Sequence, residues 1–397
     1  MQLHSYADLL RGRRAGACDR GGAANVGRFG ASCNSTRRSD RRLRATVARP
    51  GGSGGQPIDS AAQLRAQLKH LGLADPAIEA AWPRWWSDDA EASPSAQAEL
   101  RFGVARRLGL DPGSLLADDE PRFLWREEAR FKRLASENDV EQAGIASFGR
   151  AVASALASVA TPSQVDLSGW TAQDLRGRLL KAGRPYVALE DLVVLSWSFG
   201  IPVVHLRIFP WAQKRMAAMT VRVGKQSFVL LAKDALYPAW IAFYLAHELA
   251  HIALGLVDVD QALVDLETEE RETEERGATA DDDEEQAADA WALELLTGMP
   301  SPTVTSADGT ASARELARVA LASAPELGIE PGTLALCFGY STGQWGVANG
   351  AISAIYDQPA PVWQAINAFA ATQLGVTEPS PDALDFLDDV LELPSVR

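Results

Sequence analysis

The stretch YPAWIAFYLAHELAHIALGLV, residues 237–257, decides most of what the sequence says about the fold. Its apolar run from Ala239 to Val257 carries few charges and approaches the length of a membrane span. It also contains two histidines and a glutamate, and no second apolar run of that length accompanies it to shield them in a bilayer. We therefore expect a helix buried in the core of a soluble protein.

Residues 247–251 of this helix read HELAH. Residues four apart share one face of a helix, so His247 and His251 can present two imidazoles to one ion. Glu248 is rotated by about 100° from His247 and can lie beside a metal-bound water without being a ligand. The alternative is a satisfied polar cluster in a helix core. Buried imidazoles beside a buried carboxylate are costly without compensation, which favours a metal.

The third ligand has to be a carboxylate from a later helix, because the chain has no histidine after His251. The segment EQAADAWALELL offers Glu285 and Asp289 four residues apart. Glu285 could bind the metal while Asp289 accepts a hydrogen bond from a ligand imidazole and orients it. Glu284 is the competing ligand. We favour Glu285, because only Glu285 has the Ala-Asp pair at the third and fourth following positions.

Zinc in such a site has three protein ligands and one water, whose pKa it lowers to about 7. A neighbouring carboxylate can then take the proton and pass it to a leaving amine, the role that Glu248 is placed to fill. The sequence therefore indicates a hydrolase.

Composition and charge narrow the classes of protein to which the chain can belong. A net charge of −14 argues against a protein that coats nucleic acid through a broad basic surface. Three widely spaced cysteines give no disulfide framework, and no segment resembles a signal peptide, so we expect a cytoplasmic protein. Residues 1–55 are rich in Arg, Gly and Ser, and we expect disorder there. Because the charge changes abruptly, residues 1–46 could precede a true start at Val47.

The remaining pattern predicts an α+β protein that is mostly helical. We expect a helical domain over 56–160 that includes a helix across 123–135, and a zinc peptidase domain over 165–300. Three segments, IPVVHLRIF, AAMTVRV and SFVLLAKD, predict a small antiparallel sheet. Residues 265–284 predict an acidic loop, and residues 301–397 a helical C-terminal part.

Two further motifs have weaker functional interpretations. VARRLGLDPGSLL resembles the closing helices of a phage-repressor helix-turn-helix unit, which would bring Arg106 and Arg107 to DNA. The alternative, which we favour, is that both are solvated arginines on a small helical domain. His205 could reach a cleft from its strand, although a structural role is favoured.

HELAH followed by E-x-x-A-D-x-W-A-x-x-L-L-x-G-x-P resembles the ImmA/IrrE family of bacterial metallopeptidases over residues 185–300. The resemblance implies a zinc peptidase domain with a short sheet beside the helix, the ligands His247, His251 and Glu285, and Glu248 as the base. Known members cut helix-turn-helix repressors in response to DNA damage or mobile-element signals. The acidic insertion between the two motifs is longer here than the family pattern leads us to expect.

We thus expect a zinc-dependent metallo-endopeptidase that cuts a protein substrate, with no membrane partner. Residues 203–209 or 226–232 could offer a sheet edge to an extended substrate. Tyr244 and Tyr340 could stabilise an oxyanion, although packing is favoured for both. The alternative is a non-catalytic regulatory, antitoxin-like or DNA-binding protein with a structural metal. A zinc hydrolase of small molecules would need a binding motif, and we find none.

Overall fold

The structure is a computed structural model. It describes residues 60–117, 119–124, 129–132, 139–161, 165–212, 216–258, 261–266, 280–305, 312–356, 358–374 and 380–393. The disorder expected for residues 1–55 and the alternative start at Val47 lie outside these residues. Among the helices of the described ranges, none combines the length and apolar character that crossing a membrane requires.

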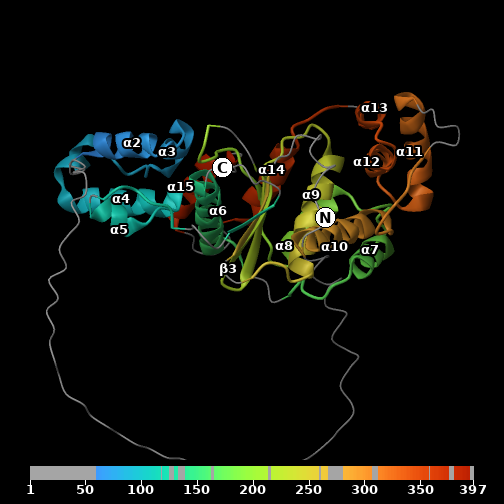
Figure 1. Cartoon of the computed structure of the whole chain (residues 1–397), viewed down its shortest axis with the longest axis horizontal. Coiled ribbons are helices and arrows are strands. Elements are labelled where there is room, and N and C mark those ends of the chain that lie inside the picture. The colour runs from blue at the N-terminus through green and yellow to red at the C-terminus, as the bar shows by residue number, and fades with distance from the viewer. Residues whose placement is uncertain are drawn as a thin grey trace, which may run out of the picture.

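A five-stranded mixed sheet lies at the centre of the molecule, with helices on both of its faces (Figure 1). The strands stand in the order β1-β5-β3-β4-β2. Their bounds are β1 Ala129–Lys132, β2 Val203–His205, β3 Met216–Val223, β4 Gln226–Leu231 and β5 Ala262–Leu266. β3 and β4 form an antiparallel hairpin, the pairing expected between AAMTVRV and SFVLLAKD.

The expectation of a purely antiparallel sheet is wrong. β2 pairs with β4 in parallel, and β1 pairs with β5 in parallel. The hairpin returns β4 in the direction of β2, and β2 pairs with β4 rather than with β3, its neighbour in sequence. A run of apolar residues indicates that a strand exists but not which strand pairs with it.

Two strands lie where the sequence indicated other structure. Residues 129–132, expected within a helix over 123–135, form β1. Residues 262–266 form β5, although no strand was expected there. Both strands are short, and their pairing with each other supplies backbone hydrogen bonds that local propensity does not reveal.

The range predicted for the acidic loop, 265–284, includes residues at both ends that belong to a strand and a helix. Asp265 and Leu266 belong to β5, and the helix α10 already begins at Ala280. The rest of that segment, residues 267–279, lies outside the described residues.

The helices largely follow the segments expected from the sequence. Their bounds are α2 Ala61–His70, α3 Asp75–Ala81, α4 Pro94–Leu108, α5 Pro112–Leu116, α6 Asp139–Val159, α7 Ala172–Lys181, α8 Leu189–Ser198, α9 Pro238–Ala253, α10 Ala280–Thr297, α11 Ala313–Leu327, α12 Pro331–Thr342, α13 Trp345–Ile355, α14 Val362–Gln373 and α15 Pro381–Leu391, with a 3₁₀ turn at Asp88–Ala92.

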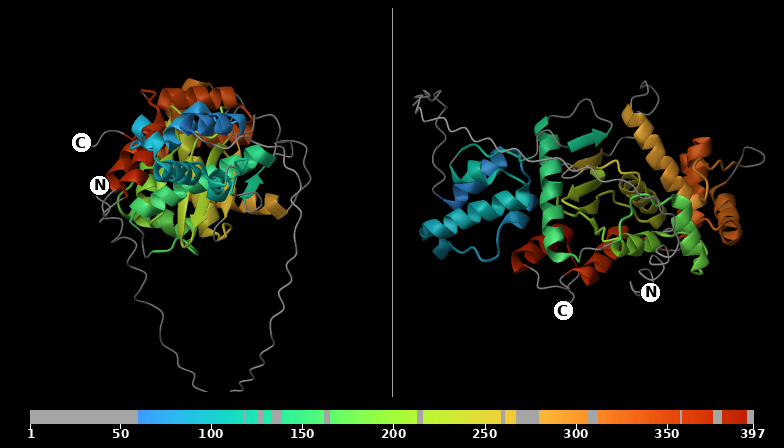
Figure 2. Two further views of the ribbon diagram at one scale, coloured as in Figure 1. Left: turned by 90° about the vertical axis from the view of Figure 1, so that its left-hand side faces the viewer. Right: turned by 90° about the horizontal axis from the view of Figure 1, so that it is seen from below.

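Helix α6 covers one face of the sheet (Figure 2). Gly149 lets it approach β3, because a Cβ at this position would lie 2.3 Å from the Met219 sulfur. Met219 and Leu230 of the sheet are fully buried beneath the helix.

Helix α9 packs on the opposite face of the sheet and also contacts α8, α10 and α12. It is enclosed on most sides, which explains why its sequence shows no continuous polar face. The expected mostly helical α+β fold is confirmed. Within it, α9 contacts β3 and β4.

Two groups of helices lie at the two ends of the molecule: α2 to α5 on the side of α6, and α11 to α13 on the side of α9 (Figures 1 and 2). One hydrophobic core runs from Leu64 of α2 through the sheet to Leu391 of α15. Packing therefore continues across residues 160 and 300, where the sequence indicated domain boundaries; the domain ranges stay predictions.

Neither sheet edge proposed for a substrate is open. β4 lies inside the sheet between β3 and β2. At β2, the His205 N–H donates to Asn367 Oδ1 and the Asn367 amide donates back to the His205 carbonyl, each at 2.8 Å. The N–H groups of Arg207 and Ile208 donate to the Val390 carbonyl. Side chains and backbone from α14 and α15 thus already satisfy the edge over 203–208.

Candidate metal centre

Helix α9 brings the two histidines of HELAH together inside the protein. His247 is 6% exposed and His251 is fully buried, and their Nε2 atoms lie 2.9 Å apart. Their rings meet nearly edge to face at 78°. The four-residue spacing thus produces the shared face expected from the sequence, with both Nε2 atoms directed at one point.

Helix α10 supplies the carboxylates. Glu285 Oε2 lies 3.3 Å from His247 Nε2, and Glu285 Oε1 lies 4.0 Å from His251 Nε2. Asp289, one turn later on the same face, places Oδ1 2.8 Å from His247 Nδ1. Within the described residues, His247, His251 and Glu285 form a group whose donor atoms all lie within 4.8 Å of one another and could hold a metal ion. Glu284 is not in this group.

The spacing of these donor atoms fits a small ion with tetrahedral coordination. Ligand atoms about 2.0–2.1 Å from zinc in a tetrahedron lie about 3.4 Å from one another. The distances here, 2.9, 3.3 and 4.0 Å, bracket that value. Two imidazole nitrogens and one carboxylate oxygen are also a donor set that zinc accepts.

Asp289 sets the tautomer of His247. A carboxylate 2.8 Å from Nδ1 accepts a hydrogen bond from that nitrogen, so the proton resides on Nδ1. The lone pair is then on Nε2, the atom that faces His251 and Glu285. The contact expected from the four-residue spacing of Glu285 and Asp289 is therefore present.

Glu248 points from α9 toward the sheet. Its side chain is 1% exposed, and Oε2 accepts a hydrogen bond of 2.5 Å from Thr220 Oγ1 of β3. Sequence reasoning missed Thr220. The available signal was a hydroxyl in the otherwise apolar run MAAMTV, at a position that is fully buried.

Aromatic rings adjoin the histidines on the side of the C-terminal helices. The Phe243 ring lies 6.2 Å from the His247 ring and 6.0 Å from that of Tyr340 in α12. The ring of Tyr244 contacts the other side of Phe243 at 6.3 Å. Both tyrosines considered for oxyanion stabilisation thus pack against Phe243, in agreement with the favoured packing role.

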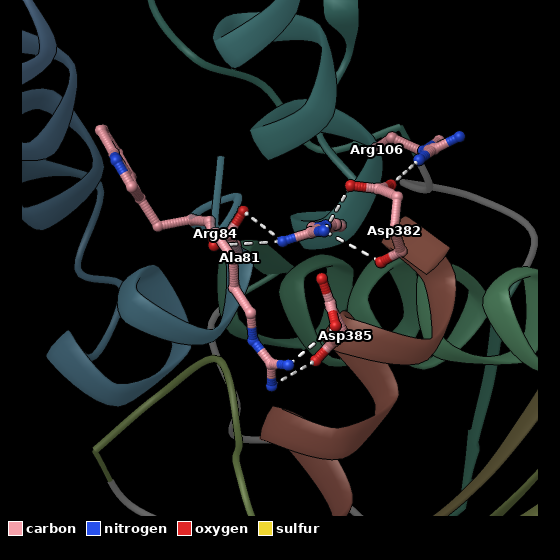
Figure 3. A network of polar contacts seen from close by, with 7 residues as sticks. Ala81, Arg84, Arg106, Asp382 and Asp385 are labelled. Atoms are coloured by element: carbon pink, nitrogen blue, oxygen red, sulfur yellow. Dashed lines mark hydrogen bonds and ion pairs between the residues drawn. The ribbon is translucent and has the colours of Figure 1, made fainter. Parts of the chain in front are cut away.

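The Arg107 side chain is buried against protein, whereas the Arg106 side chain is 56% exposed. The expectation of two solvated arginines therefore fits Arg106 and is wrong for Arg107. Figure 3 shows Arg106 beside Asp382. Both guanidinium groups pair with Asp382 of α15, and the Arg107 side chain is only 3% exposed. Burial lowers the pKa of the Arg107 guanidinium, and the charge of Asp382 opposes that effect. Nothing in this arrangement favours DNA contact through these two residues.

Two other potentially reactive side chains, His205 and Cys337, have structural roles. His205 is 1% exposed and its ring nitrogens lie 3.0 Å from the carbonyls of Leu206 and Lys233. Burial raises the pKa of the Cys337 thiol to about 12, so this cysteine stays protonated at neutral pH.

Comparisons with models of protein families, with curated proteins and with solved structures find no significant match to this chain.

Proposed function

We propose that this protein is a zinc-dependent metallo-endopeptidase. The observation that carries the proposal is the convergence of Glu285 on the facing Nε2 atoms of His247 and His251. Glu248, the next residue after His247 on α9, adds a buried carboxylate. The likeness of HELAH and of the segment from Glu285 to Pro300 to the ImmA/IrrE pattern supports the same reaction.

Each residue would have a distinct role. His247, His251 and Glu285 would hold the ion, and Asp289 would keep His247 in the tautomer that presents Nε2. Zinc in such a site supplies Lewis acidity and makes water a nucleophile near neutral pH. Glu248 would accept the proton of the attacking water and deliver it to the nitrogen of the leaving amine. The hydrogen bond from Thr220 would hold that carboxylate in place.

We further propose a cytoplasmic protein substrate, a helix-turn-helix repressor that is cut during a stress or mobile-element response. The resemblance carries this part of the proposal. A structural metal site would not require Glu248, so the presence of this residue favours an enzyme over a regulatory protein with a structural metal.

The test is to co-express the chain with its genomic neighbours in zinc-supplemented cells and to compare wild type with Glu248→Gln. We expect wild type to cleave one neighbour and the variant to leave it intact while binding the same amount of zinc. His247→Ala is expected to lose stoichiometric zinc. Equal cleavage by wild type and Glu248→Gln, or intact neighbours in both, would count against an enzyme and favour the regulatory alternative.

A further inference from the structure

Helices α12 and α13 bring aromatic side chains to the metal centre. From His247 the ring contacts run to Phe243, then to Tyr340 of α12, then to Trp345 at the start of α13. Trp345 in turn stacks on Trp240 of α9 at 5.8 Å. We call Phe243, Tyr340, Trp345 and Trp240 the aromatic row. It joins the C-terminal helices, for which the sequence indicated no role, to the helix that holds the histidines.

The members of the aromatic row differ in exposure. Trp240 and Trp345 are partly buried and pack against the core shared by α9, α11, α12 and α13. The Tyr340 side chain is 55% exposed, among the highest values for a large hydrophobic residue in the described ranges. Packing in this shared core therefore accounts for the tryptophans but leaves more than half of the Tyr340 surface exposed.

Tyr340 is nevertheless held in a fixed position. Its ring meets Trp345 at 4.7 Å and 82°. Trp345 can approach α12 this closely because residue 339 is glycine, where a Cβ would come within 2.7 Å of the indole. An exposed ring that is held by packing loses little conformational entropy when a ligand binds to it.

We propose that Phe243 and Tyr340 form the wall of a subsite that binds a large apolar or aromatic side chain of the substrate polypeptide. This inference rests on the proposed peptidase function and specifies its substrate. The occupant follows from continuity with the metal centre: a peptide held over His247 has a neighbouring side chain within reach of Phe243, whose ring is 6.2 Å from the imidazole. Aromatic and aliphatic side chains gain most from contact with such a wall.

The proposal gives the C-terminal helices a function in specificity. Phe243 is one helical turn before His247, so the metal centre and one part of the wall belong to α9. Tyr340 comes from α12. Substrate choice would therefore depend on how α12, which lies outside the segment that resembles the metallopeptidases, sits against α9.

The experiment compares wild type, Tyr340→Ala and Tyr340→Phe, all loaded with zinc, on a peptide library made from a digested proteome. Cleavage sites are read by mass spectrometry. Phe102 of α4, which is 49% exposed at the other end of the molecule, supplies the matched control Phe102→Ala. We expect Tyr340→Ala to lower kcat/KM by about tenfold for peptides with Phe, Tyr or Leu at one position beside the cut. Peptides with Ala there should change less than about twofold.

Tyr340→Phe keeps the ring and should retain the preference, as should Phe102→Ala. An equal loss on all peptides, or a loss in Tyr340→Phe as large as in Tyr340→Ala, would overturn the proposal, since the hydroxyl rather than the ring would then matter. Equal zinc content and melting temperature show that the variants are folded.

A second measurement separates this inference from the proposed function. Zinc-loaded Glu248→Gln is immobilised with and without Tyr340→Ala, and a displayed library of random octapeptides is selected on both. Enrichment of aromatic and large aliphatic residues at a fixed position, lost with Tyr340→Ala, would support the wall even if wild type cut nothing. Absence of such enrichment, or enrichment of Arg and Lys instead, would overturn it.

Discussion

At the scale of single residues, the candidate site depends on which face of α10 is turned toward the histidines. Glu284 and Glu285 are adjacent, yet one residue turns a helix by about 100°. Of the two, Glu285 lies on the same face as Asp289, which follows it by four residues. Glu285 is also the one that belongs to the metal-binding group with the histidines. Asp289 then fixes the proton of His247 on Nδ1 from the same face.

This geometry predicts different zinc affinities for three neighbouring substitutions. Glu285→Gln removes an ion-holding oxygen and should weaken zinc binding by more than about 100-fold, beyond the range for outer partners. Asp289→Ala should weaken it by about 10- to 100-fold, because it releases the orientation of His247. Glu284→Gln is the control and should bind zinc as wild type does. Competition with a chromophoric chelator measures all three, and a larger effect for Glu284 than for Glu285 would show that the register has been misassigned.

At the scale of elements, ion pairs join α15 to α4 and to the segment between α3 and the 3₁₀ turn. Arg107 Nη2 donates to Asp382 Oδ1 at 2.5 Å and to the Asp382 carbonyl at 2.9 Å. Arg84 bonds Asp385 and Asp389 on the same helix (Figure 3 shows the pair with Asp385). The Arg107 guanidinium is buried, whereas the Arg106 side chain is 56% exposed.

The ion pairs that Asp382 forms with Arg106 and with Arg107 should therefore contribute differently to the free energy of unfolding. Asp382→Ala leaves the buried Arg107 charge without its carboxylate and should lower the free energy of unfolding by about 3 kcal/mol. Arg106→Ala removes only the exposed pair and should lower it by less than about 1 kcal/mol. Urea unfolding followed by circular dichroism compares them. Equal effects would mean that the Arg107 pair is solvated rather than buried.

At the scale of the whole molecule, α15 connects parts that are far apart in sequence. Phe386, Leu387, Val390 and Leu391 are at most 1% exposed and pack in the core that begins at Leu64. Through the Val390 carbonyl the same helix also bonds the backbone that follows β2. Its apolar face thus completes the core of the helices at the N-terminal end.

A chain that stops after residue 374 should therefore fail to fold cooperatively. Each of the four side chains lost from the core contributes about 1.5–3 kcal/mol when buried, a sum comparable with the total stability of a typical domain. The control chain begins at Ser60 and retains every buried residue of the described ranges. Thermal melting and limited proteolysis should show one cooperative transition for the control and none for the shortened chain. A sharp transition in the shortened chain would show that α15 is dispensable.

The sequence by itself determined the features that local chemistry dictates. Periodicity placed α9 and the helices that follow it, and the four-residue spacings within HELAH and from Glu285 to Asp289 put each pair on one face of a helix. Those spacings are properties of a single helix, so they can be read without knowing what the helix packs against.

Only the tertiary structure decided how these elements meet. β1 pairs with β5, as at Ala129 and Ala262, and β5 pairs with both β1 and β3; neither segment shows that pairing in its own sequence. Likewise, the hydroxyl of Thr220 on Glu248, the ring of Tyr340 against Phe243 and the pairing of Arg107 with Asp382 join distant segments. Contacts of this kind arise when a shared core fixes the positions of several elements at once, and local propensity carries no record of them.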